Sequence, residues 1–159
     1  MRIGVPRWVV VGLAVIFQAY DVLALELTSL HIAHSPYPVF AAMVLFAIAT
    51  TLSLLPLGGP QMPIWLAAFD FSVVVASTLL VSSQLPLHGV VLGYATWYVA
   101  AVGALMTIVA TRQQLLWAWL GTGFLVLHTL FWAGPAAVLD FGVLGSVSWV
   151  VVAHVISLA

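Results

Sequence analysis

The chain of 159 residues is 65% hydrophobic and only 4% charged, and its mean hydropathy is +1.26. Soluble domains carry about 25% charged residues, so this composition excludes a water-soluble globule. Three basic residues and a net charge of −1 exclude binding to a nucleic-acid backbone. Cysteine is absent, which excludes disulfides and thiolate metal sites. The composition therefore predicts a polytopic helical membrane protein.

Proline and glycine divide the chain into six apolar stretches. A bilayer core of about 30 Å needs about 20 helical residues, and proline or glycine commonly ends a helix. The predicted spans cover residues 8–30, 39–55, 64–81, 90–110, 115–132 and 137–158. The sequence predicts an all-α fold, a six-helix transmembrane bundle that forms one domain over residues 1–159. Short connections predict that consecutive helices are antiparallel neighbours.

Three arginines set the expected orientation. Arg2 and Arg7 precede the first span, and Arg112 lies between the fourth and fifth spans, which is the same side in a six-span protein. The positive-inside rule predicts that this side and both termini are cytoplasmic, in a bacterial plasma membrane. A cleaved signal peptide is the rival interpretation of the N-terminus. Asp21 and Glu26 disfavour it, because small neutral residues are preferred near a cleavage site.

Ionisable residues inside a membrane are costly and are therefore candidates for function. His128 and Asp140 flank the turn 133–135 at nearly equal distances, so we expect them at one depth on adjacent helices. With Glu26, this pair predicts a ligand-binding or sensing site near the outer side. The alternative is an interhelical hydrogen bond with a structural role only.

Two acids and three aromatic residues complete the main candidates. Asp21 and Asp70 are candidates for proton coupling, although Ser, Thr or Trp donors packed against them would also explain buried acids. Tyr94, Trp97 and Tyr98 lie together in the fourth span and predict an aromatic ligand pocket or, alternatively, core packing.

Small residues recur at three- or four-residue spacing in two spans. Gly103 belongs to such a series in the fourth span, and Gly142, Gly145 and Ser146 form another in the sixth. Faces of this kind allow membrane helices to approach closely. We therefore expect these two faces to lie in helix–helix contacts.

No cofactor or enzymatic activity is predicted. Divalent metal binding by His31, His34 and His88 stays an alternative, although a tight helical ligand spacing is absent. Bis-histidine haem needs two imidazoles at one depth, and only His88 and His128 approach this condition. The chain carries no nucleophile elbow, zinc-protease motif or phosphate-binding loop, so we expect no catalytic centre.

Five short stretches carry a resemblance to a known family. They are GYATWYVA at 93–100, MTIVA at 106–110, AWLG at 118–121, LFWAGP at 130–135 and GSVSWV at 145–150. Over roughly residues 90–157 the chain resembles the N-terminal membrane region of actinobacterial sensor histidine kinases. In that family a six-helix region precedes a cytoplasmic dimerisation and ATP-binding core.

The resemblance implies a membrane-embedded input module without its kinase core. The chain stops at Ala159 and contains no asparagine, so the nucleotide-binding box of the family is absent. The end resembles a helix cut where it leaves the membrane. Membrane lipids and a second copy, or other membrane subunits, are the expected partners. A small stand-alone transporter or channel, or a structural subunit of a membrane complex, are the alternatives.

Overall fold

The computed structural model describes residues 16, 30–31, 33–85, 96–140 and 142–158. These residues form helices and connecting turns, without strands. The helices are α3 (Pro36–Leu54), α4 (Ile64–Ser82), α5 (Trp97–Thr111), α6 (Leu115–Ala133), α7 (Pro135–Asp140) and α8 (Val143–Leu158). The all-helical prediction is therefore confirmed for the described residues.

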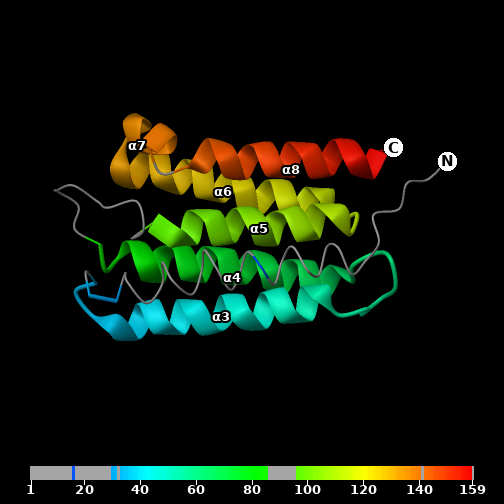
Figure 1. The fold of residues 1–159 in the computed structure, drawn as a ribbon, viewed down its shortest axis with the longest axis horizontal. Helices are drawn as coiled ribbons and strands as arrows, with labels where there is room; N and C mark the ends of the chain where they lie inside the picture. Colours follow the sequence, from blue (N-terminus) through cyan, green and yellow to red (C-terminus); the bar gives the residue numbers. More distant parts are fainter. Residues whose placement is uncertain (1–15, 17–29, 32, 86–95, 141, 159) are drawn as a thin grey trace.

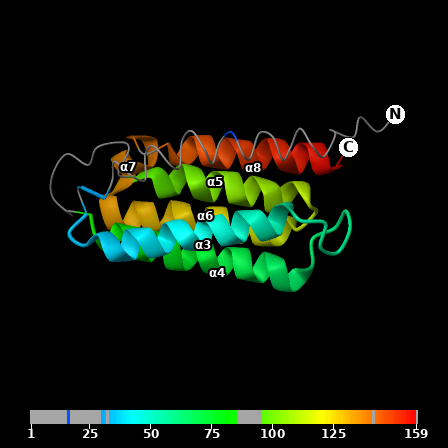
Figure 2. The same cartoon turned by 60° about the horizontal axis from the view of Figure 1, so that its bottom comes forward.

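The long helices run side by side, and the short α7 lies at one end of the molecule (Figures 1 and 2). Helices α3, α5 and α8 point in one direction, whereas α4 and α6 point in the other (Figure 1). Helix α5 contacts α3, α4, α6 and α8, and most of its residues are buried. It is therefore the central helix of the described bundle.

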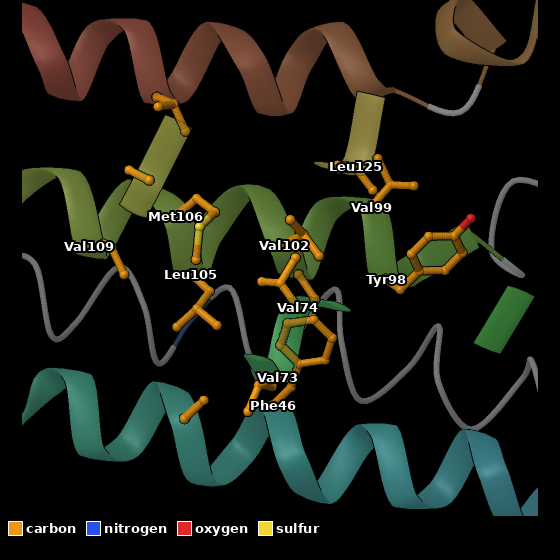
Figure 3. Close-up of a cluster of buried hydrophobic side chains, with 14 of the residues drawn as sticks. Phe46, Val73, Val74, Tyr98, Val99, Val102, Leu105, Met106, Val109 and Leu125 are labelled. Carbon is orange, nitrogen blue, oxygen red and sulfur yellow. The ribbon is translucent and has the colours of Figure 1, made fainter. Parts of the chain in front are cut away.

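The core forms where side chains from four helices meet. Figure 3 shows Phe46 of α3 and Val74 of α4 close to Val102 of α5, and Leu125 of α6 beside Val99 of α5. Each of these five side chains is almost completely buried. Apolar and aromatic side chains from neighbouring helices thus interdigitate around α5.

Proline and glycine set the helix boundaries much as the sequence predicts. Helix α3 has proline in its first turn, and α6 ends at Gly134, which adopts a φ of 87°. The predicted sixth span is one difference, because Gly142 adopts a φ of 73° and separates α7 from α8. A left-handed backbone of this kind interrupts a right-handed helix. The first predicted span lies almost entirely outside the described residues.

The outer surface of the bundle is apolar. Among the described residues, α3, α4 and α6 are long and apolar enough to cross a membrane, whereas α5 and α8 are shorter apolar helices. Large hydrophobic side chains are exposed on several helices, including Phe40, Trp65, Phe131 and Trp149. So many exposed large hydrophobic side chains need a lipid or protein cover.

Candidate functional site

Asp70 is a carboxyl group in the interior of the bundle. It lies on α4 and is completely buried. Ser53 of α3 donates a hydrogen bond from its Oγ to Asp70 Oδ2 over 2.6 Å. Asp70 Oδ1 has no hydrogen-bond partner among the residues that the structure describes. Because an unpartnered polar atom in an apolar interior is costly, this oxygen is a candidate for a binding role.

Arg112 lies in the connection between α5 and α6, and its side chain binds backbone carbonyls at the end of α3 and in the loop that follows. Its Nη1 donates to the carbonyl oxygens of Ser53 at 2.9 Å and Leu55 at 3.2 Å. Its Nη2 donates to the carbonyl oxygens of Leu57 at 2.5 Å and Gly59 at 3.1 Å. A planar guanidinium presents several donors in a fixed fork, which suits a ring of carbonyls. We call these four contacts the Arg112 clamp.

Backbone geometry completes the clamp. The Met62 amide donates to the Arg112 carbonyl at 3.1 Å, and Gln114 Nε2 donates to the Met62 carbonyl at 2.6 Å. Gly58 has a φ of 76°, and a Cβ there would lie only 2.7 Å from Pro63 Cγ. The loop between α3 and α4 therefore requires glycine at this position. The sequence analysis used Arg112 only for orientation, although a loop bounded by prolines, which lack an N–H, was a signal for carbonyls that need an outside donor.

The predicted aromatic site lies at the start of α5, and Trp97 and Tyr98 are both buried there. The Trp97 ring meets Phe46 of α3 edge to face, with centroids 5.8 Å apart. Trp97 Nε1 and the Tyr98 hydroxyl have no hydrogen-bond partner among the described residues. The next residue, Val99, accepts a hydrogen bond at its carbonyl from Ser146 Oγ of α8, over 2.9 Å. The aromatic pair is thus adjacent to a polar link between α5 and α8.

A close helix contact reinforces this link. A Cβ on Gly103 would lie 2.5 Å from Ser146 Oγ, 2.7 Å from its Cβ and 3.0 Å from its Cα. The expected role of Gly103 and Ser146 in helix packing is therefore confirmed. Gly145 has open space around its Cα, and Gly142 lies at the break before α8. Of the three small residues predicted to form this face of α8, only Ser146 lies in the contact with α5.

His128 has a different partner from the one expected. Its Nε2 lies 3.2 Å from Ser82 Oγ of α4, and its ring stacks on Trp132 with centroids 6.1 Å apart. Asp140 is exposed at the end of α7. The structure shows no ion pair between His128 and Asp140, both of which it describes. Equal distance from the turn did not bring them together, because the His128 side chain is directed at α4.

The other predicted positions add little to a site. His31 and His34 are exposed before α3. Within the described ranges, no three His, Cys, Asp or Glu side chains gather in a way that could hold a metal ion. Four candidates lie outside the described residues: Asp21, Glu26, His88 and Tyr94. Among the described candidates, Asp70, Trp97 and His128 make interhelical contacts, and Tyr98 is completely buried.

These features define an all-helical protein with three helices able to cross a membrane and with polar links between its helices. The chain belongs to the family described as a domain of unknown function (DUF8320), whose family model matches residues 5–159. No curated protein and no solved structure matches it. The matched residues include every helix described above.

Proposed function

We propose that this protein is a multi-pass membrane input module, which detects a signal inside the bundle and transmits it through α8. The proposed topology is a six-span bundle in a bacterial plasma membrane with both termini cytoplasmic. The apolar outer surface and the three long apolar helices support this proposal. In this proposal the chain has no catalytic activity of its own and works with a second copy or another membrane subunit.

The contact between α5 and α8 carries the proposal. The buried Trp97–Tyr98 pair begins α5, and the adjacent Val99 carbonyl is bonded to Ser146 of α8. One turn further along, Gly103 packs directly against Ser146. A signal that changes the packing around the aromatic pair therefore acts on the helix to which α8 is attached. Closely packed interfaces switch between discrete arrangements, so a small local shift can move a whole helix.

The unpartnered polar atoms of the aromatic pair indicate where a signal would act. Trp97 Nε1 can only donate a hydrogen bond, whereas the Tyr98 hydroxyl can donate or accept one. A ligand that pairs with either atom in one arrangement of α5 stabilises that arrangement. The change in free energy between the two arrangements equals the difference in the ligand's binding free energy for them. In the histidine kinases that the sequence resembles, a helix leaving the membrane region would pass this shift to the kinase core.

Removal of one hydroxyl tests the connection between the aromatic pair and α8. Tyr98→Phe keeps the ring and deletes the buried hydroxyl, whereas Tyr37→Phe makes the same change at an exposed position on α3. We expect Tyr98→Phe to change amide hydrogen exchange in α8, measured by mass spectrometry in lipid nanodiscs. Tyr37→Phe should leave α8 at the wild-type rate. Identical α8 exchange in both variants and the wild type would refute the proposed transmission.

A further inference from the structure

Asp70 and the Arg112 clamp meet at a single residue. Ser53 donates its hydroxyl to the Asp70 carboxyl, and its carbonyl accepts from Arg112. Arg112 is also close enough to act on the carboxyl electrostatically. A movement that releases the clamp would therefore move the hydrogen-bond donor of Asp70.

The position of Asp70 suits access from the clamp end. It lies six residues after the start of α4, which corresponds to about 9 Å along the helix. The loop between α3 and α4, which Arg112 holds, lies at that end. Because Asp70 is completely buried and its Oδ1 has no partner among the described residues, the carboxyl is closed to bulk water in this arrangement.

The other ionisable groups on the helices that pack against α4 lie far from Asp70. Helix α3 carries only Tyr37 near its first residue, and α5 carries Tyr98 near its own start. Helix α6 carries His128, whose partner Ser82 lies twelve residues beyond Asp70, or about 18 Å along α4. Within the described residues, Arg112 is the charged group that faces the Asp70 end of the bundle.

We propose that Asp70 is a proton-binding site and that the Arg112 clamp is the lid that closes it toward the loop end. With the clamp formed, the carboxyl exchanges no proton with water. When the last turn of α3 and the loop leave Arg112, Ser53 moves with them and water reaches Asp70. The carboxyl then transfers its proton to water, forming hydronium, and regains one before the loop closes. This site does not depend on the transmission through α8 proposed above.

The chemistry of the clamp explains its residue types. Lysine would keep the charge of Arg112 but could not reach four carbonyl oxygens with a single ammonium group. Gly58 permits the left-handed turn between Leu57 and Gly59, whose carbonyls both accept from Arg112. A substitution of Arg112 or of Gly58 should therefore weaken the clamp, so the two residues provide independent variants.

Chemical labelling tests access to Asp70. A water-soluble carbodiimide takes up the carboxyl proton as the carboxyl oxygen adds to its central carbon, and an added amine then displaces the urea to form an amide. Modification of Asp70 in nanodiscs is measured by peptide mass spectrometry. We expect slow modification in the wild type and at least about tenfold faster modification in Arg112→Gln, because loss of even one of the four charged hydrogen bonds shifts an equilibrium by that order. Gly58→Ala should also accelerate it.

Three controls separate opening of the lid from other effects. Arg7→Gln removes the same charge elsewhere in the sequence and should keep the wild-type rate. Gly103→Ala destabilises the α5–α8 contact without touching the clamp and should also keep it. Asp140, which is exposed, should react equally in every variant. The proposal is overturned if both clamp variants react at the wild-type rate, or if Gly103→Ala accelerates modification as much as they do.

Discussion

The substitution Gly103→Ala tests the α5–α8 contact most directly. The new methyl group would meet both the side chain and the Cα of Ser146. The hydroxyl could rotate away, but the Cα belongs to the backbone of α8 and cannot. The two helices must therefore separate, and the hydrogen bond from Ser146 to the Val99 carbonyl weakens with them.

The expected cost follows from three contributions. Overpacking costs about 1–3 kcal/mol, and an interhelical hydrogen bond in a membrane contributes about 0.6 kcal/mol. Replacement of a helical glycine by alanine returns about 1 kcal/mol through helix propensity. Gly103→Ala should therefore reduce the free energy of unfolding by about 0.6–2.6 kcal/mol.

Gly145→Ala is the matched control on the opposite helix. It adds the same methyl group one residue before Ser146, where no atom lies within 4 Å. We expect no loss of stability and a gain of up to about 1 kcal/mol. Both variants are compared by titration with sodium dodecyl sulfate, followed by circular dichroism. If they unfold at the same detergent fraction, the close approach of α5 and α8 is refuted.

Two further substitutions are assayed by the same titration. Ser53→Ala should reduce the free energy of unfolding by about 1–3 kcal/mol, because it removes the donor to Asp70 and leaves a buried carboxyl without that bond. Ser72→Ala, at an exposed position on the same helix as Asp70, should change it by less than about 0.5 kcal/mol, and equal effects would contradict the reasoning. Asp140→Asn should also have an effect below about 0.5 kcal/mol, because this carboxyl is exposed and forms no pair with His128. A large loss of stability in Asp140→Asn would instead support the predicted pairing of His128 with Asp140.

Part of the candidate site was predictable from the sequence. Asp70 was recognised because an acid is rare and costly in an apolar span, and Trp97 and Tyr98 because polar-tipped aromatic residues cluster there. Gly103 and Ser146 were recognised because small residues recur at helical spacing. These predictions depend on residue types and on their spacing along the chain, and both can be taken from a single sequence.

The identity of each partner was not predictable. His128 was expected beside Asp140 but bonds to Ser82, and Arg112 was expected to mark a membrane side but also holds four carbonyls. Partners depend on how each helix is rotated about its axis. In a soluble helix an apolar stripe marks the buried face, but these helices are apolar on nearly all sides.

The sequence by itself determined the apolar character of this protein, its helical class and most helix ends among the described residues. Those properties follow from the total hydrophobicity of the chain and from proline and glycine, which end a helix through local backbone effects. Only the tertiary structure decided that α5 is central, that α8 is bonded to it through Ser146, and that Ser53 contacts both Asp70 and Arg112. Those properties depend on contacts between residues far apart in the chain, where packing shape and hydrogen-bond geometry select among many apolar faces of similar energy.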